Sequence, residues 1–411
     1  MNTESGHFEA IFIGGGAASF FAAIRLAELV PGINCAILEK GKTVLNKVRI
    51  SGGGRCNVTN TITDPRELSE NYPRGQKSLI GPFNRFGSRD TVEWFERRGV
   101  ELKAEADGRV FPVSDNSQSI VDCLMDEVKK YGIAVITGEN VKKIRRLNDG
   151  TWDLQASQNQ YRCKQLFVGS GSSPAMWAVL RGLGLPMVEP HPSLFTFNIN
   201  DPRIKGLQGI SLPVVELKIS GTPLKSTGPL LITHWGLSGP AILKLSAWGA
   251  RQLAEMNYRF ELVVKWMSAE NAQNLIEDSR AMHPSEKVYK KPFVAFPVRL
   301  WRSLVAYLRI SEETRWADLS KKHMNALGEQ LSNCRLKVDG KSTFKEEFVT
   351  AGGVNLKALD LREFRSVDYP NLFLAGEVLN IDALTGGFNF QAAWSGGWIA
   401  GSSMSKAHRP G

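Results

Sequence analysis

The chain has 411 residues, of which 42% are hydrophobic and 22% charged, and its net charge at pH 7 is +10. This size and apolar content are ample for a buried core and for two or three domains, and no run approaches the roughly 20 apolar residues of a membrane helix. The five cysteines lie far apart without a CxxC pair, which excludes a disulfide scaffold and predicts a reduced, cytoplasmic protein. Since no membrane helix is expected, we expect no membrane partner.

The polar residues before Phe8 do not resemble a signal peptide, and an apolar run of strand length then extends to Ile13. This run breaks at a glycine turn, residues 14–19, which is followed directly by the apolar spacing of a helix. A second apolar run, residues 35–38, ends in Glu39. Strand, glycine turn, helix, strand and terminal acid follow one another in the order of a dinucleotide-binding unit.

Each part of this unit has a physical role. Gly14 permits the tight turn, and Gly16 lets backbone N–H groups approach a pyrophosphate at the helix N-terminus. Glu39 can accept hydrogen bonds from a ribose diol. Ser19 stands where the pattern has its third glycine, and it is small enough for close packing of helix on strand. The alternative is an ordinary glycine-rich loop.

Further elements follow in the first half of the chain. We expect a second glycine-rich loop at residues 51–60, a helix at 91–98, a turn and short strand at 108–112, a helix at 119–131, strands at 133–136 and 141–147, a hairpin over 152–161, and a buried strand at 165–168. The buried strand ends in Gly169-Ser170-Gly171.

The pattern changes near Pro186. Prolines there punctuate short strands at 194–199, 214–219 and 230–232, and residues 268–327 are helical and basic. A strand at 371–377 and a final helix at 390–402 close the chain. We therefore predict an α/β fold in which a Rossmann-like domain (1–190 and 346–411) is interrupted by a β-rich domain (191–345) with a helical, basic insert (268–327).

Five separated segments carry a resemblance to a known family. They are SGGGRCNVTN (51–60), GRVFPVS (108–114), THWGLSGPAIL (233–243), TAGGV (350–354) and AGEVLNIDALTGGFNFQAAWSGG (375–397). In this order they resemble the BaiN/RdsA-type NAD(P)/FAD-dependent oxidoreductases, over nearly the whole chain. The resemblance implies FAD bound in an extended pose across the Rossmann-like domain, with substrate entering beneath an inserted β-barrel-like domain.

The resemblance also implies individual cofactor contacts. Those on the phosphate and adenosine side are Gly14, Gly16 and Ala17 at the pyrophosphate, Glu39 at the ribose, Lys40 and Lys47 as positive charge, and the Val141 backbone at adenine. Those on the ribityl and flavin side are Ser51, Gly52, Gly53, Arg55, Cys56 and Asn57. Gly376 and Glu377 resemble a second FAD fingerprint, and Gly387 and Asn389 would place N–H donors near the flavin pyrimidine edge. Donors at that edge stabilise the anionic reduced flavin.

The chain departs from the family pattern at three places. Residues 168–172 read VGSGS where relatives usually read ATGG. Asn380 stands where an aspartate is usual, although Asp382 is nearby. The segment around Trp177 and Leu180 is shortened and rewritten. These departures indicate a divergent subgroup.

Three residues near these motifs have alternative readings. Cys56 is either a redox thiol beside the flavin or a small packing residue. His234 either donates a proton above the flavin or holds the turn at residues 236–240. Arg109 either binds an anionic group or pairs with a surface acid. The histidines and cysteines show no metal-ligand spacing, so no metal is expected.

The basic insert is a candidate nucleic-acid surface. Its basic residues alternate with aromatic ones, a composition that suits a phosphate backbone with stacked bases. The candidate RNA-binding residues are Lys287, Lys290, Lys291, Arg299 and Arg302. The alternative is a solvated face, and the overall positive charge is equally compatible with solubility alone.

These observations predict an FAD-dependent oxidoreductase. Only one complete dinucleotide fingerprint is present, so NAD(P)H would bind transiently as electron donor. Hydride would pass from reduced flavin to an electron-poor carbon, with a proton from His234 or water. The resemblance offers three substrate classes: uridine in ribosomal RNA, a steroid-like enone, or a small amine that is oxidised. We favour the RNA; a non-catalytic flavin protein is a further alternative, and the oligomeric state is left open.

Overall fold

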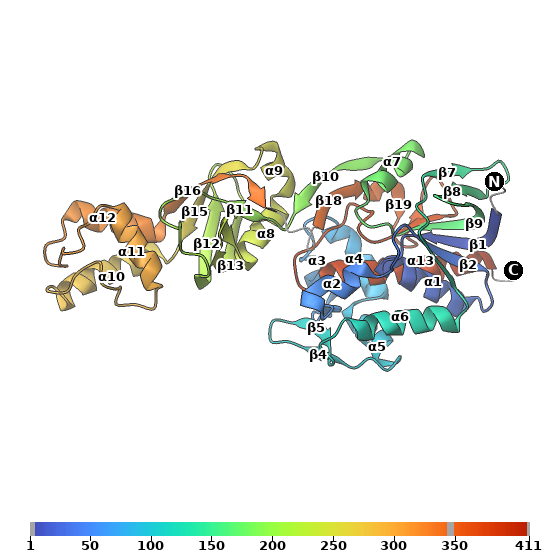
Figure 1. Ribbon diagram of the computed structural model, residues 1–411, viewed down its shortest axis with the longest axis horizontal. Helices are drawn as coiled ribbons and strands as arrows, with labels where there is room; N and C mark the ends of the chain where they lie inside the picture. Colours follow the sequence, from blue (N-terminus) through green and yellow to red (C-terminus); the bar gives the residue numbers. More distant parts are fainter. Residues whose placement is uncertain (1–4, 343–348, 409–411) are drawn as a thin grey trace. The chain divides into compact units, whose positions relative to one another are not determined.

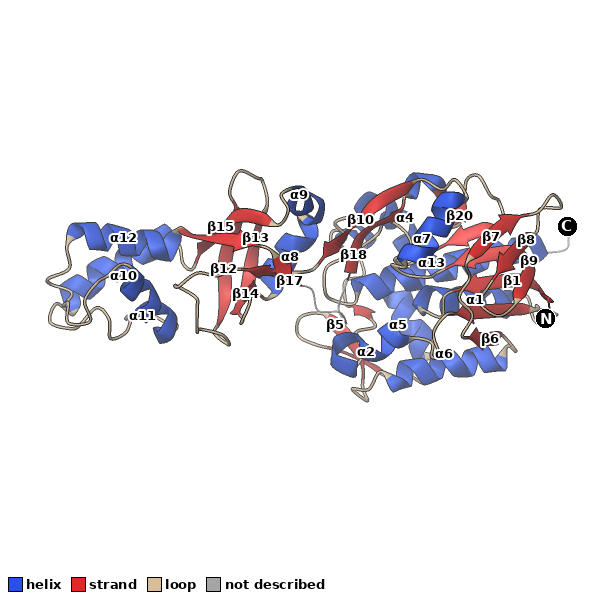
Figure 2. Ribbon diagram, turned by 45° about the horizontal axis from the view of Figure 1, so that its top comes forward, coloured by secondary structure: helices blue, strands red, loops and turns tan. Residues whose placement is uncertain are grey.

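The computed structural model describes residues 5–342 and 349–408. The chain divides into two compact units, one made of Met1–His191 and Val349–Gly411, the other of Pro192–Phe348 (Figures 1 and 2). The second predicted boundary, between residues 345 and 346, lies outside the described residues. Within the described ranges, no helix combines the length and apolarity needed to cross a membrane.

The first unit is built on a mainly parallel sheet. Its parallel strands lie in the order β21-β9-β1-β2-β6, with bounds β1 Ser5–Ile13, β2 Cys35–Glu39, β6 Ala134–Thr137, β9 Gln160–Val168 and β21 Leu372–Leu374. Antiparallel pairs extend it, namely β7 Lys143–Arg146 with β8 Trp152–Gln155, and β19 Leu359–Asp360 with β20 Arg365–Ser366. Ile13 is in register with Leu38 and with Val168, so β1, β2 and β9 end at one edge of the sheet.

Two helices far apart in sequence pack together beside this sheet. α1 (Ala17–Leu29) lies along α13 (Phe388–Met404), and the rings of Phe21 and Trp394 are 4.6 Å apart. The other helices are α2 Asn46–Gly54, α3 Pro65–Ser69, α4 Gln76–Arg85, α5 Ser88–Glu96, α6 Gln118–Lys130, α7 Pro174–Gly182 and two 3-10 helices, Leu356–Ala358 and Ser405–His408.

Two small sheets complete this unit. One has three strands, β3 Thr59–Asn60, β5 Arg109–Pro112 and β4 Leu102–Ala104. The other pairs β10 (Met187–Ser193) with β18 (Val349–Val354), where the chain leaves and returns. The Rossmann-like α/β fold predicted from the sequence is confirmed.

The second unit contains a sheet that closes on itself. Its strand order is β16-β15-β12-β13-β14-β11-β17, with bounds β11 Thr196–Asn198, β12 Ser211–Ile219, β13 Lys225–Ile232, β14 Gly236–Ser238, β15 Arg259–Lys265, β16 Cys334–Asp339 and β17 Lys341–Ser342. Only Gly340 separates the two edge strands β16 and β17. One continuous segment therefore pairs with β15 at one edge and with β11 at the other, which makes a small barrel.

Among the described residues of this unit, five helices accompany the barrel. α8 (Pro240–Trp248) and α9 (Ala250–Glu255) follow β14, whereas α10 (Ala269–Met282), α11 (Val298–Tyr307) and α12 (Lys321–Ser332) lie between β15 and β16 in sequence. The apolar stripe of α11 is buried with Trp301 and Trp316, whose rings are 6.1 Å apart. The barrel and these helices share one apolar core.

The structure also contains helices that the sequence analysis did not predict. α3, α7 and α8 begin at Pro65, Pro174 and Pro240, and α4 contains Pro82. No helix was predicted at these prolines. Proline is well suited to the first turn of a helix, where its missing N–H has no intrahelical partner to lose, so three of them mark helix starts.

Candidate cofactor site

The glycine turn lies at the shared edge where β1, β2 and β9 end. Gly14 has φ +98° and donates its N–H to Leu38 O at 2.8 Å, and a Cβ there would lie 2.7 Å from Gly169 O. Gly16 precedes α1 without a side-chain cap, and the first helical bond is from Phe20 N–H to Gly16 O. The N–H groups before this bond, from Ala17 onward, therefore have no intrahelical partner and are available to bind an anion.

The Glu39 carboxylate lies beside this turn. Its two oxygens accept the N–H groups of Gly15 and Gly41, each at 2.7 Å. These bonds fix the carboxylate at the end of β2, and each oxygen keeps a lone pair for a ribose hydroxyl. Lys40 is exposed.

Val141 lies next to the same edge. The neighbouring Glu139 donates its N–H to Glu39 O at 2.9 Å, and the Val141 side chain is buried. β7 begins two residues later than expected, at Lys143, so Val141 belongs to the preceding loop. In the described part of the chain, its N–H and carbonyl have no backbone partner, as an adenine contact would require.

The second glycine-rich loop begins at Ser51, inside the bounds of α2, where the backbone angles are no longer helical. Ser51, Gly52 and Gly53 have non-helical angles, and Cys56 has φ +63°. This region matches the predicted loop.

The Asn57 side chain joins this loop to the beginning of α13. In the orientation that gives both amide atoms a partner, its nitrogen donates to Thr59 O at 3.0 Å and its oxygen accepts the Gly387 N–H at 2.8 Å. The Gly387 N–H is thus engaged within the protein. The Asn389 side chain is also engaged, with the N–H and carbonyl of Ala383 at 3.0 and 3.2 Å. The remaining candidate donors at this helix start are the backbone N–H groups of residues 388–390.

Lys47 and Glu377 form an ion pair with each other. Lys47 was expected to place positive charge beside the phosphates, but its charge is balanced by Glu377 here. Gly376, two residues after the end of β21, has φ +80°. Glu377 Oε2 also lies near Gly171, at 3.7 Å from the position of a Cβ there, so the segments after β9 and β21 converge.

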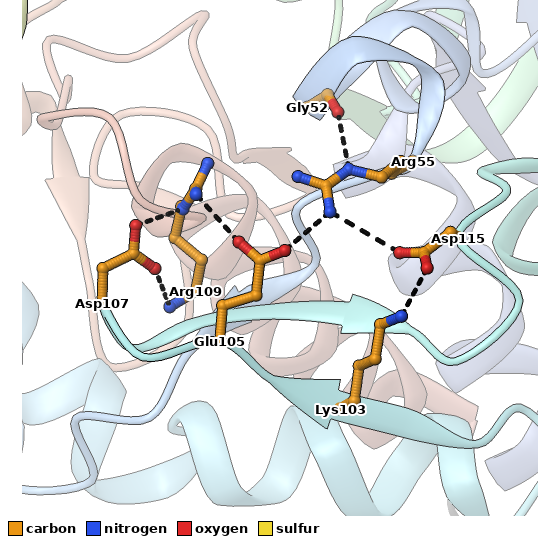
Figure 3. A network of polar contacts seen from close by, with 7 residues as sticks. All are labelled: Gly52, Arg55, Lys103, Glu105, Asp107, Arg109 and Asp115. Carbon is orange, nitrogen blue, oxygen red and sulfur yellow. Dashed lines mark hydrogen bonds and ion pairs between the residues drawn. The ribbon is translucent and has the colours of Figure 1, made fainter.

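The Arg55 side chain belongs to a network of charges (Figure 3). Its guanidinium contacts Glu105 at 2.6 Å and Asp115 at 3.6 Å and lies over the Phe111 ring, 4.0 Å from its centre. The hydrogen bond to Glu105 raises the pKa of the Arg55 guanidinium above its ordinary value. This side chain ties the loop to β4 and β5 and leaves cofactor contact at this position to the backbone.

Glu105 also binds Arg109, at 2.8 Å (Figure 3). Arg109 contacts Asp107 as well, at 2.7 Å, and this hydrogen bond lowers the pKa of the Asp107 carboxyl. Of the two readings of Arg109, the structure supports pairing with surface acids.

The Cys56 side chain is fully buried. Burial raises the pKa of its thiol to about 12, so the group is neutral at physiological pH. A neutral, buried thiol is a poor nucleophile, which favours the packing role over the redox role.

Several buried polar contacts near the site were missed by the sequence analysis. Arg74 and Asp382 form a buried ion pair. The Gln391 side chain accepts from Thr59 Oγ1 at 2.6 Å, and Trp177 Nε1 donates to Val378 O at 3.0 Å. A buried glutamine in the apolar helix α13 was the available signal, because it needs a partner in the core.

The Ser19 side chain fits because residue 169 is glycine. A Cβ at Gly169 would lie 2.4 Å from Ser19 Oγ and 2.8 Å from Phe167 Cε1. Ser19 lies at the contact of helix on strand, where its hydroxyl donates to Ile13 O at 3.5 Å. Two departures from the usual pattern are therefore coupled sterically.

We expect Gly169→Ala to lower the free energy of unfolding by about 1–3 kcal/mol, because it overpacks this contact. Ser19→Ala removes the clashing hydroxyl, so the double variant should recover part of the loss. Urea unfolding of the three variants, with FAD added, measures both effects. Additive losses in the double variant would contradict the coupling.

The predicted catalytic His234 lies in the second unit, in the turn between β13 and β14. Its side chain is exposed. The turn is held instead by Thr233, whose N–H donates to Gly236 O at 2.8 Å and whose hydroxyl accepts the Trp235 N–H at 3.3 Å. These bonds hold residues 233–236, and in the described residues the turn at 236–240 receives no hydrogen bond from the His234 side chain.

The predicted RNA-binding residues lie around α11 and the loop before it, and most have partners within the protein. Lys287 pairs with Glu313 at 2.6 Å and Lys290 with Glu286 at 2.9 Å. Arg299 donates to Gly206 O, and Arg302 donates to Lys290 O. Lys291 is exposed.

A family model described as HI0933-like protein Rossmann domain matches residues 8–403. The chain is similar to a ribosomal RNA dihydrouridine synthase of Haemophilus influenzae, 28% identical over 416 residues that cover 98% of this chain and 100% of that protein. It is also similar to a 3-dehydro-bile acid delta(4,6)-reductase of Clostridium scindens, 24% identical, with 97% and 98% covered. A solved 3-ketosteroid-delta4-(5alpha)-dehydrogenase from Rhodococcus jostii RHA1 shares the fold, with TM-score 0.52, 12% identity and 98% of each chain covered.

Proposed function

Because the chain belongs to the family of HI0933-like proteins with a Rossmann domain, we propose that it is an FAD-dependent oxidoreductase that reduces uridine in ribosomal RNA to dihydrouridine. The family resemblance inferred from five sequence segments is confirmed, and with it the class of flavin-dependent oxidoreductase. The observation that carries the substrate is the similarity, over the full length of both chains, to a protein with this named activity.

The residues of the first unit fit FAD. The close approach of Gly14 to Gly169 and the uncapped start of α1 suit a pyrophosphate. Ser170 lies two residues after the end of β9, and its Oγ is buried without a hydrogen-bond partner among the described residues. An unpaired buried hydroxyl is costly, and a phosphate or ribose oxygen at this edge would satisfy it.

When bound, FAD supplies hydride transfer to and from the flavin ring. The turn at residues 14–17 would bind the pyrophosphate, Glu39 the adenosine ribose, and the Val141 backbone the adenine. Asn57 sets the distance between the glycine-rich loop and the start of α13, because it binds both Thr59 O and the Gly387 N–H. The N–H groups at the start of α13 would then face developing negative charge on the flavin pyrimidine edge.

We propose NAD(P)H as the electron donor and His234 as the proton donor to the substrate. His234 is exposed, so a bulky substrate can reach it. A second candidate function is reduction of a steroid-like enone, which the similarity to the bile acid reductase favours. Both reactions reduce a C=C bond conjugated to a carbonyl, so one site chemistry would serve either substrate.

Anaerobic stopped-flow absorbance of the FAD-loaded protein tests the proposal. NADH or NADPH should bleach the flavin, and a ribosomal RNA fragment lacking dihydrouridine should restore its absorbance and yield dihydrouridine. Restoration by a steroid-like enone but not by RNA would support the second candidate. Bleaching by neither donor would contradict both and favour amine oxidation or a non-catalytic flavin. His234→Gln should slow restoration while bleaching stays unchanged.

A further inference from the structure

The positive charge of the second unit is concentrated on the barrel. The barrel segments, residues 192–267 and 334–342, contain eleven Lys and Arg residues against five Asp and Glu residues. The helical segment between them, residues 268–333, contains ten against eight, and ion pairs there engage Lys287 and Lys290. The excess of positive charge that suggested an anionic partner therefore lies mainly outside the helical insert.

The outer face of the barrel carries much of this excess positive charge. Along β12, β13, β15 and β16, alternate side chains point outward, and the exposed charged ones include Glu216, Lys218, Lys225, Arg259, Lys265, Arg335, Lys337 and Asp339. Three ion pairs balance part of it: Lys265 with Glu216, Arg335 with Glu261 and Arg259 with Asp339. Three lysines have no ion-pair partner in the described residues, and we call Lys218, Lys225 and Lys337 the barrel lysines.

Two of the barrel lysines are direct cross-strand neighbours. Lys218 on β12 is in register with Lys225 on β13, and both side chains are exposed. Directly opposed residues have Cβ atoms about 4.5–5.5 Å apart, and like charges at that distance destabilise a sheet. On its other side, Lys218 is in register with Val263 on β15, which is in turn in register with Arg335 on β16. A phosphate bound between Lys218 and Lys225 would neutralise this repulsion, so the pair suits an anionic ligand.

The strand that carries Lys225 leads to an exposed aromatic side chain. β13 ends at Ile232, and the turn after it presents His234 and Trp235, with 59% of Trp235 exposed. At about 3.3 Å per residue, Lys225 lies about 20 Å along the strand from Leu231, which is also exposed. An exposed tryptophan offers a stacking surface for an unpaired base, and the lysines offer contacts to the flanking phosphates.

We propose that the outer face of the barrel, rather than the helical insert, binds the RNA backbone through the barrel lysines. This inference rests on the proposed function, since it assigns a surface to that substrate. The contacts are electrostatic and independent of sequence, so they add affinity and orientation while the chemistry selects the base.

A pair of variants with equal charge change tests the surface. One is Lys218→Gln/Lys225→Gln/Lys337→Gln, and the other is Lys290→Gln/Lys291→Gln/Arg302→Gln in the helical insert. Binding of a ribosomal RNA fragment is measured by fluorescence anisotropy from low to high salt. The barrel variant should bind about tenfold or more weakly, with the slope of log K against log salt reduced by about two to three. The insert variant should change both quantities less.

Thermal melting and FAD content establish that each variant folds. The barrel variant should melt at or above the wild-type temperature, because it removes the Lys218–Lys225 repulsion. Wild-type-like RNA binding by the barrel variant, or a larger loss in the insert variant, would overturn the surface assignment alone. If the wild-type protein binds this RNA no better than it binds heparin of equal concentration, the proposed RNA substrate fails together with the surface.

Discussion

Arg74→Met should lower the free energy of unfolding by about 3–5 kcal/mol, because it leaves a buried carboxylate without its cation. Asp382 is fully buried, and both of its oxygens contact the Arg74 guanidinium. The backbones of the two residues also form a β-bridge. The pair therefore anchors the segment between β21 and α13, which contains the predicted FAD contacts Gly376 and Glu377, to the residues before α4.

Urea unfolding of the FAD-loaded protein measures this loss. Arg97→Met is the matched control, since Arg97 and its partner Glu93 have 75% and 46% of their side chains exposed, and its cost should stay below about 1 kcal/mol. Replacing both partners, as Arg74→Met/Asp382→Leu, should recover much of the loss. A cost for Arg74→Met as small as the control's would contradict a structural role for the pair.

The sequence predicted those parts of the fold whose signals are local. The unit from β1 to β2 was predicted correctly because a glycine turn and a terminal acid mark each boundary within a few residues. Helices that begin with proline were missed, because no helix was predicted at Pro65 or Pro174. The 3.6-residue period is also weak in helices this short.

The candidate site could be predicted only as separate motifs. Glu39 lies 24 residues after Gly15, and the strand–turn–helix–strand pattern between them is enough to predict that they meet. The contact between Asn57 and Gly387 joins residues that are far apart in the chain, and it depends on how α13 packs. The partners of Arg55 depend on the register of β4 and β5, so the loop-holding contacts of this predicted cofactor residue could not be predicted from the sequence.

Gly387→Ala should lower the free energy of unfolding by about 2–4 kcal/mol and reduce the FAD content of the purified protein. Gly387 has φ +87°, and a Cβ there would lie 2.3 Å from Thr59 O. That oxygen belongs to the backbone of β3, so no side-chain rotation can relieve the clash. The start of α13 would have to move away from the glycine-rich loop, and the Asn57 bridge to the Gly387 N–H would break.

Gly32→Ala separates backbone strain from this clash. Gly32 has φ +78°, close to that of Gly387, but a Cβ there would have nothing within 4 Å. Its cost should therefore be about 1 kcal/mol, with full FAD content. FAD absorbance per protein and urea unfolding compare the two variants. Equal losses would show that the left-handed conformation alone matters at residue 387, and the close approach of α13 to the loop would then have no part in holding the cofactor.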